Sequence, residues 1–362
     1  MNELSLGFGL IGAGVIADFH ARAIAAARGA HGVGVASRTT EGASAFARRH
    51  NLAFATASVE ELVAHPDVHA VCITTPSGLH REPALTAIRA GKHLMIEKPI
   101  DTTLEGTDEI LRAADGAGVR VGSIFQARFG DAAKGVKAAI DAGRFGRLAL
   151  CSAYVKWHRT KQYYTGWKGT RALDGGGALI NQAIHAIDLL QWFAGMPTEV
   201  FGWTTRRVHV GIESEDTACA TLRFANGALG TIEASTAVWP GWSRRLEICG
   251  ESGSAVLEDD DIARWEFLDE QPQDEAIRKT GESAAMGSGA SAPNAISFEG
   301  HRRQIQDFVD AIRENRQPAI DGREASKAVA LVRAIYESAA RSAPVRLVDP
   351  SGVLWRIAQD MP

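Results

Sequence analysis

The chain of 362 residues has no apolar run near the roughly 20 residues that a membrane-spanning helix needs. Its start, Met1-Asn2-Glu3-Leu4, lacks the basic region, apolar stretch and cleavage site of a secretory signal. The formal net charge is −4, and no block of like charges is present that would attract nucleic acid. These absences predict a cytoplasmic protein with neither a membrane nor a nucleic acid as its partner.

Cysteine is also scarce. The sequence has four cysteines, far apart and without a C-x-x-C pair: Cys72, Cys151, Cys219 and Cys249. This spacing argues against a zinc ribbon or a dithiol redox site, and we expect no metal site. We interpret the four side chains as reduced thiols that act as small apolar residues.

Length and composition indicate two globular domains. At about 150 residues per domain, the chain is long enough for two. The hydrophobic fraction of 45% and the charged fraction of 23% are ordinary for globular proteins. These values do not fit a disordered chain or a coiled coil.

The first third alternates short apolar runs with stretches of helical pattern. The apolar runs lie at 6–11, 32–36, 68–74, 94–96 and 119–125, and the helical stretches at about 16–27, 83–90 and 104–114. This alternation predicts an α/β domain with a parallel, doubly wound sheet, at residues 1–124.

The remainder, residues 125–362, reads as an α+β domain with a large mixed or antiparallel open sheet. Alternation over 217–224 predicts a half-buried strand, and Asn226-Gly227 predicts a hairpin with a primed turn before a return strand at 229–237. Helices are expected at 301–315 and 323–339. Residues 270–293, rich in Ser, Gly, Ala, Glu and Gln, predict a mobile surface loop that could act as a lid.

The motif Gly12-Ala13-Gly14-Val15-Ile16-Ala17 closes the first expected strand and opens a helix. Gly12 permits a tight turn, and Gly14 lets the backbone approach a pyrophosphate. Val15 and Ile16 begin a helix whose N-terminus favours anions. The pattern predicts dinucleotide binding; the alternative is a glycine-rich turn without a ligand.

Ser37 and Arg38 follow the second expected strand, where an acidic residue would select NAD. Arg38 could instead pair with a 2′-phosphate and stack on adenine. We therefore favour NADP over NAD as cofactor, with a solvated surface arginine as the alternative.

Two further motifs carry candidate catalytic groups. Lys98, in Glu97-Lys98-Pro99, ends the expected strand at 94–96, at the sheet edge where ligands of such sheets bind. His185 lies on a helix expected to begin near Leu179, with Asn181 and Asp188 at helical spacing on the same face. A histidine with a purely structural role is the alternative.

Together these motifs resemble the glucose–fructose oxidoreductase, inositol dehydrogenase and rhizopine-catabolism family, called Gfo/Idh/MocA. Further matches are the segments 75–80, Thr-Pro-Ser-Gly-Leu-His, and 90–93, Ala-Gly-Lys-His. The resemblance covers nearly the whole chain. It implies an N-terminal Rossmann domain and a C-terminal α+β domain whose open sheet is often used to form oligomers, here a dimer or tetramer.

The resemblance also implies residue roles. Lys98 would hold the reacting hydroxyl and His185 would accept its proton. The cofactor would be lined by Thr75, Pro76, His80, Glu97, Gln126, Trp167 and Lys168. Arg128 lies where the family approaches the substrate.

The basic and aromatic stretch before Trp167 includes His158 and Tyr163, which we assign to substrate binding, with surface-loop residues as the alternative. Many polyol dehydrogenases of the family carry Asp where this chain has Asn181. A branch that resembles nucleotide-sugar 3-dehydrogenases carries Asn there, which favours a carbohydrate with a large or acidic appendage.

The sequence therefore predicts an NAD(P)-dependent oxidoreductase that acts on a hydroxyl or keto carbon of a sugar, cyclitol or sugar derivative. Two alternatives stay open: a redox-neutral NAD-dependent glycosidase, and a non-catalytic sensor of nucleotide or sugar. A third is an enzyme whose cofactor stays bound and exchanges with substrate.

Overall fold

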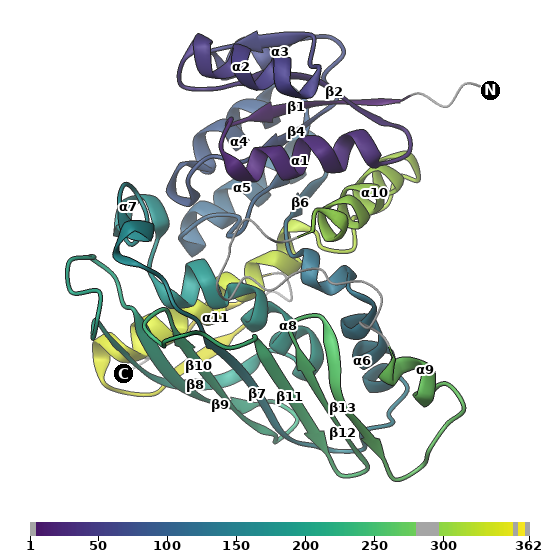
Figure 1. Cartoon of the computed structure of the whole chain (residues 1–362), viewed down its shortest axis with the longest axis vertical. Helices are drawn as coiled ribbons and strands as arrows, with labels where there is room; N and C mark the ends of the chain where they lie inside the picture. Colours follow the sequence, from purple (N-terminus) through teal and green to yellow (C-terminus); the bar gives the residue numbers. More distant parts are fainter. Residues whose placement is uncertain (1–4, 280–296, 350–353, 359–362) are drawn as a thin grey trace. The chain divides into compact units, whose positions relative to one another are not determined.

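The computed structural model describes residues 5–279, 297–349 and 354–358, which divide into two compact units (Figure 1). The first contains residues 1–126 and 298–325, and the second contains residues 127–297 and 326–362. The segment 298–325 thus belongs to the first unit, whereas the sequence places it in the second domain. No helix among the described residues is both long and apolar enough to cross a membrane.

The first unit is built on a six-stranded parallel sheet in the order β3-β2-β1-β4-β5-β6. The strands are β1 (Leu6–Ile11), β2 (Ala30–Ala36), β3 (Phe54–Thr56), β4 (Ala70–Ile73), β5 (His93–Ile96) and β6 (Val121–Ser123). Every residue of β1 and β4 is buried, because helices cover both faces of such a sheet. The α/β doubly wound class predicted from the sequence is confirmed.

Helices alternate with these strands. They are α1 (Val15–Ala26), α2 (Thr40–His50), α3 (Val59–Ala64), η1 (Ser77–Leu79), α4 (Arg81–Arg89), α5 (Leu104–Ala117) and, at the end of the segment, η2 (Gln126–Phe129). The later helix α10 (Glu299–Arg313) joins them: its Phe308 packs against Phe8 of β1 in the core. Gln304 of α10 donates to the carbonyl of Ser123 (2.7 Å) and accepts from the amide of Phe125 (3.1 Å). These contacts explain why this distant segment belongs to the first unit.

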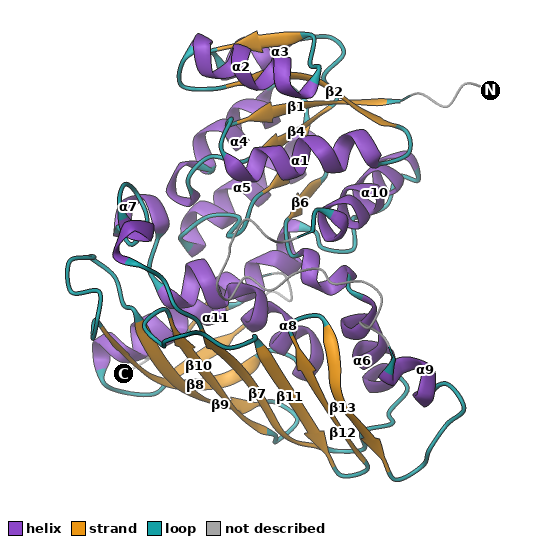
Figure 2. Ribbon diagram, viewed as in Figure 1, coloured by secondary structure: helices purple, strands orange, loops and turns teal. Residues whose placement is uncertain are grey.

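The second unit is built on a nine-stranded mixed sheet in the order β13-β12-β11-β7-β10-β9-β8-β14-β15 (Figure 2). The strands are β7 (Leu148–Lys156), β8 (Pro197–Thr205), β9 (Thr217–Phe224), β10 (Leu229–Ser235), β11 (Arg245–Gly250), β12 (Gly253–Glu258), β13 (Asp261–Phe267), β14 (Val345–Val348) and β15 (Arg356–Ile357). Among the described strands of this sheet, β7 and β10 are the one pair that runs parallel. The predicted α+β class with a large mixed sheet is confirmed.

Helices of the second unit are α6 (Asp131–Asp141), η3 (Lys161–Tyr164), α7 (Arg171–Asp174), the π-helix η4 (Ala178–Ala183), α8 (Ile184–Ala194), α9 (Asp274–Arg278) and α11 (Gly322–Arg341). Helix α11 begins in the first unit and continues into the second. The segment η4 packs on β7, β9 and β10, and α8 packs on β7 and β11. They cover one face of the sheet, and Leu150, Trp203 and Leu229 are exposed.

The hairpin between β9 and β10 forms where predicted, with the buried residues of β9 alternating along the strand. Its turn is not the predicted primed type, because only Gly227 has a positive φ (88°) and Asn226 does not. The amide of Gly227 donates to the carbonyl of Phe224 (3.1 Å), and the Phe224 amide donates to Ala228 (2.9 Å). This is a longer turn that ends in a glycine bulge, which also satisfies the strand twist. The return strand ends at Ser235.

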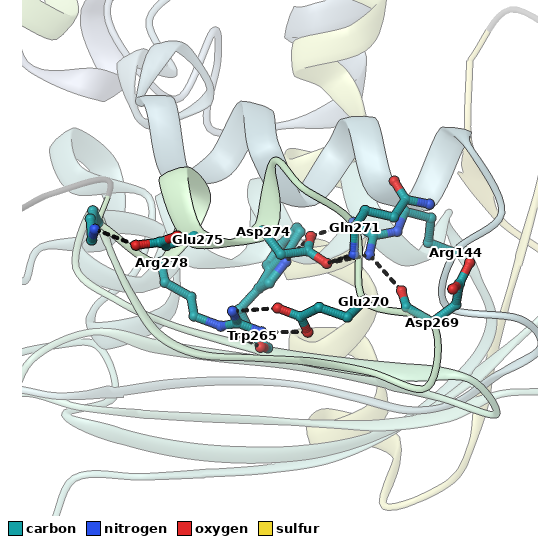
Figure 3. A network of polar contacts seen from close by, with 9 residues as sticks. Arg144, Trp265, Asp269, Glu270, Gln271, Asp274, Glu275 and Arg278 are labelled. Atoms are coloured by element: carbon teal, nitrogen blue, oxygen red, sulfur yellow. Dashed lines mark hydrogen bonds and ion pairs between the residues drawn. The ribbon is translucent and has the colours of Figure 1, made fainter.

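Residues 270–279 are held in place by α9 and its ion pairs, which corrects the predicted mobile loop for this part of the segment (Figure 3). Asp274 of α9 is fully buried and accepts hydrogen bonds from Arg144 (2.6 and 2.7 Å) and from Trp265 Nε1 (2.7 Å). The Arg144 guanidinium holds the pKa of Asp274 far below its usual range. The rest of the predicted loop, 280–293, lies outside the described residues.

We expect Asp274→Asn to lower the free energy of unfolding by about 3–5 kcal/mol, because it leaves the enclosed Arg144 charge without its partner. Urea unfolding measures this loss. Glu270→Gln is the control: its pair with Arg278 is exposed and screened by solvent, and we expect little change in the free energy of unfolding. Since the pKa of Asp274 is depressed, its contribution is present above the unfolded pKa and is lost as the pH falls through the folded one. Equal losses in both variants would contradict this assignment.

Candidate active site

The glycine turn after β1 has the shape that a pyrophosphate site requires. Gly12 has φ 110°, and a Cβ there would lie 2.6 Å from Thr74 Oγ1. Gly14 precedes α1 without a side-chain cap, and a Cβ on it would meet no atom within 4 Å. Val15, which is 59% exposed, and Ile16 begin the helix. Open space above an uncapped helix N-terminus fits a bound dinucleotide phosphate.

The end of β2 carries no carboxylate. The strand ends at Ala36, followed by half-buried Ser37 and exposed Arg38. Thr39 accepts from the amide of Gly42 (3.1 Å) and caps α2. Residues 36–39 therefore include no carboxylate that would repel a 2′-phosphate, and the first acidic residue is the exposed Glu41 in the first turn of α2.

The loops that follow β4 and β5 are tied together by His80. Its ring nitrogens lie 2.8 Å from the carbonyl of Pro99 and 3.0 Å from that of Thr75, and burial lowers its pKa. Thr75 Oγ1 donates to the carbonyl of Leu79 (3.0 Å), and Pro76 precedes η1. His80 thus fixes the backbone of two segments predicted to line the cofactor.

Glu97 is buried between two histidines that the sequence motifs did not identify. Its Oε1 lies 2.9 Å from His20 Nε2 and 3.7 Å from His301 Nε2, and its Oε2 accepts the backbone N–H of Lys98 (3.1 Å). Burial raises the pKa of Glu97, but the contacts with His20 and His301 outweigh it and hold the pKa well below the usual value. An anionic Glu97 therefore anchors the backbone of Lys98, whose side chain is half-buried.

His20, Glu97 and His301 each offer one metal-ligand atom, all within 4.8 Å of one another. Within the described residues, Nδ1 of both histidines has no hydrogen-bond acceptor. A metal-bound imidazole normally donates its other N–H to such an acceptor. We interpret the cluster as a support for Lys98, in which His20 hydrogen-bonds to Glu97 and His301 packs beside it at 3.7 Å.

Gln126 closes the first unit. Its Oε1 is buried and has no partner among the described residues. A buried amide oxygen of this kind calls for a water or a ligand, which agrees with its predicted place beside the cofactor.

The second unit brings together three predicted residues: Tyr163, Lys168 and Asn181. Gln182 Nε2 donates to Tyr163 Oη (2.6 Å) and to Asn181 Oδ1 (2.9 Å). Lys168 Nζ lies 3.8 Å from the centroid of the Tyr163 ring. Arg159, which belongs to the predicted basic stretch, donates to Gln182 Oε1 (2.9 Å).

Asp174 organises this cluster, and no prediction assigned it a role. It is buried and accepts from Asn181 Nδ2 and from the amide of Gly169 (2.8 Å). This bond fixes the Asn181 amide, so its oxygen faces Gln182 and Tyr163. Burial lowers the pKa of Lys168, and Asp174 partly opposes that shift.

His185 is the second residue of α8 and is half-buried. The sequence predicts an ordinary helix from Leu179, but the segment Ala178–Ala183 is π-helical. The predicted α-helical spacing of Asn181, His185 and Asp188 therefore does not hold across this segment. Such wide turns recur at functional sites.

Of the other predicted residues of this unit, Trp167 touches that cluster, because Lys168 Nζ lies 5.9 Å from the centroid of its ring. The side chains of Arg128 and His158 contact other residues. Arg128 is 4% exposed and donates to Asp188 (2.6 Å), so its charge is already paired. His158 contacts the Trp239 ring, with the ring centroids 5.0 Å apart. Trp167 is half-buried, and its carbonyl accepts from Thr170 Oγ1 (2.6 Å). Their assignments to substrate or cofactor stay predictions.

Comparison with known proteins identifies the class. Residues 6–125 match the model of an oxidoreductase family with an NAD-binding Rossmann fold, and residues 134–256 match the GFO/IDH/MocA C-terminal domain. The chain belongs to this family, as its motifs indicated. It is an NAD-dependent oxidoreductase by class. Several of its relatives are named as dehydrogenases or reductases of sugars and cyclitols.

Three relatives illustrate the range. The chain is 34% identical to a 1,5-anhydro-D-fructose reductase of Ensifer adhaerens, over 61% of this chain and 67% of that protein. It is 32% identical to an inositol 2-dehydrogenase of Acidothermus cellulolyticus, over 70% of this chain and 73% of that protein. A crystal structure of the WlbA dehydrogenase from Bordetella pertussis with NADH and UDP-GlcNAcA is 31% identical and superimposes with a TM-score of 0.84, over 95% of this chain and 99% of that one.

Proposed function

We propose that the protein interconverts a hydroxyl and a keto carbon of a sugar, cyclitol or sugar derivative. The observation that carries the proposal is the set of polar contacts among Tyr163, Asn181 and Gln182, immediately before His185. Hydroxyl, amide and imidazole groups together are suited to bind and deprotonate a polyhydroxylated substrate.

Each residue has a defined task in this proposal. The Lys98 ammonium donates to the reacting oxygen and stabilises the charge that develops on it. His185 accepts the hydroxyl proton at a ring nitrogen during oxidation and returns it during reduction. Gly12, Gly14, Val15 and Ile16 hold the dinucleotide phosphates. The nicotinamide, when bound, accepts or supplies the hydride.

We also propose a substrate with a large or acidic appendage. The Lys168 ammonium, which the sequence motifs assign to the cofactor, lies over the Tyr163 ring. The Tyr163 hydroxyl lies 3.5 Å from Oδ1 of Asn181, the residue that distinguishes this chain from many polyol dehydrogenases. A ring for stacking and a cation nearby suit a sugar that carries a carboxylate or phosphate. The predicted homo-oligomer would bury the sheet face that exposes Leu150, Trp203 and Leu229, and it stays a prediction.

The test supplies NAD⁺ or NADP⁺ with inositols, neutral sugars and nucleotide sugars that contain a uronic acid, and follows the absorbance of the reduced nicotinamide. Substrate-dependent reduction of the cofactor supports the proposal. Release of a free sugar without net reduction identifies a glycosidase. Binding of cofactor and sugar without either reaction identifies a sensor and overturns the proposal.

We further propose a preference for NADP, because the end of β2 offers Arg38 and no carboxylate. Fluorescence titration is expected to show tighter binding of NADPH than of NADH. Arg38→Ala should weaken NADPH binding roughly tenfold or more and NADH binding much less, since only NADPH loses a charge-assisted contact, worth about 1.5–3 kcal/mol, while both lose the stacking on adenine. Tighter binding of NADH by the wild type would refute this preference. Arg48→Ala is the matched control, because Arg48 is also an exposed arginine but lies in the last turn of α2.

A further inference from the structure

Glu215 is a buried carboxylate to which neither the motifs nor the proposed chemistry assign a role. It lies two residues before β9 and is 7% exposed. Its Oε1 accepts the amide N–H of Leu179 (2.9 Å), and its Oε2 accepts that of Gly177 (3.1 Å). Its backbone carbonyl accepts the N–H of Ala178 (3.1 Å). One residue therefore binds three successive amides at the start of η4.

These amides are the groups that a helix start leaves without partners. Gly177 supplies no side-chain cap, and a Cβ there would lie 1.8 Å from the carbonyl oxygen of Glu215. Only glycine permits this close approach, and the cap comes instead from Glu215. The capped segment carries Asn181 and passes without a break into α8, which carries His185.

Glu215 is not itself placed as a proton donor or acceptor for substrate. Its oxygens are taken by the two amides and by the hydroxyl of Tyr336 on α11, which lies 2.9 Å from Oε1. The neighbouring carboxylate of Asp216 turns away and accepts the amides of Arg207, Val208 and His209.

The charged groups near Glu215 are few. Arg333 of α11 lies over the Tyr336 ring, 5.8 Å from its centroid, and η4 presents only backbone amides. No lysine or arginine in the described part of the chain forms an ion pair with Glu215. Burial therefore raises its pKa to about 7, against the hydrogen bonds that favour the ionised form.

We propose that Glu215 is a positioning residue for the site, whose ionised carboxylate fixes the start of η4 and with it Asn181 and His185. This inference rests on the proposed function of those two residues. A protonated carboxyl is a weaker acceptor for the amides of Gly177 and Leu179 than a carboxylate, because it has lost the charge that strengthens those hydrogen bonds. The segment then shifts, and turnover falls although the protein stays folded.

Protonation has the opposite effect on global stability, which separates positioning from folding. The folded pKa lies above the unfolded value near 4.3, so the native state binds more protons between these values. From this group alone, stability falls as the pH rises from about 4.3 to about 7 and is level above that. Protonation of Glu215 stabilises the folded protein. A loss of turnover at acidic pH therefore cannot result from global unfolding caused by this group.

The kinetic test compares the pH profile of kcat in wild type and in Glu215→Gln. Protonation of Glu215 should lower kcat roughly tenfold, so log kcat in wild type should drop by about one unit as the pH falls through about 7. In Glu215→Gln this step should be absent and kcat should stay at the lower level, because the amide cannot ionise. A step of unchanged size in Glu215→Gln overturns the proposal.

Asp216→Asn is the matched control, since that carboxylate also accepts three backbone amides but in the loop after β8. We expect it to keep the step near pH 7, even where it lowers stability. A loss of the same step in Asp216→Asn would show a general structural effect and overturn the specific role of Glu215.

Hydrogen exchange of the peptide that spans 177–185, corrected for intrinsic rates, needs no substrate. Protection of this peptide should decrease below pH 7 in wild type and should be low at every pH in Glu215→Gln. NADH binding to the first unit serves as the folding control. Absence of turnover with every substrate would refute the proposed function, whereas unchanged exchange would refute the role of Glu215.

Discussion

The His185→Ala variant is expected to lose about 10²–10⁴-fold in kcat while it binds NADH as tightly as the wild type. The reason is that alanine removes the acceptor of the hydroxyl proton. The residues predicted to hold the dinucleotide phosphates lie in the first unit, and His185 lies in the second. Steady-state kinetics with the best substrate of the panel, together with a fluorescence titration, measure the two quantities separately.

His31→Ala is the control for this variant. His31 is exposed at the start of β2, and among the described residues its side chain hydrogen-bonds only to Ser5. It should leave both kcat and NADH affinity unchanged. Normal turnover in His185→Ala would remove His185 from the mechanism. Weakened NADH binding would instead indicate a loss of structure beyond the substituted side chain.

The fold was predictable where the signal is local. The apolar run at 6–11 and the alternation at 217–224 each have one dominant period, and both form the expected strands. The strand β3 has three residues, too few to show any period. Helix α10 shows a clear apolar stripe, but a stripe does not tell which core receives Phe308.

The candidate site divides in the same way. Motifs with close spacing, such as Gly12 with Gly14 and Glu97 with Lys98, identified the loops that the structure places at strand ends. The supporting partners come from far along the chain: His20 is 77 residues from Glu97, and Tyr336 is 121 residues from Glu215. No local pattern encodes such pairs, because tertiary packing alone brings them together. The π-helix is likewise invisible to a search for a period of 3.6.

Lys98→Met is expected to lower kcat by about 10²–10³-fold, the usual cost of removing one donor from a developing oxyanion. Methionine keeps the length of the side chain and removes its charge. The Glu97 carboxylate accepts the backbone N–H of Lys98, and the substitution leaves this N–H in place. The local backbone should therefore keep its conformation. Lys92→Met is the control, because the Lys92 ammonium donates to the carbonyl of Val68 (2.7 Å) and should affect stability without affecting kcat.

The double variant Lys98→Met, His185→Ala decides whether the two residues act on one oxygen. Groups that serve the same transition state are strongly non-additive, so the double variant should have nearly the kcat of the slower single variant. Fully multiplicative losses would mean that the two residues assist separate steps. Near-normal turnover in Lys98→Met alone would leave the lysine a structural role, and the acid–base chemistry would then depend on the second unit alone.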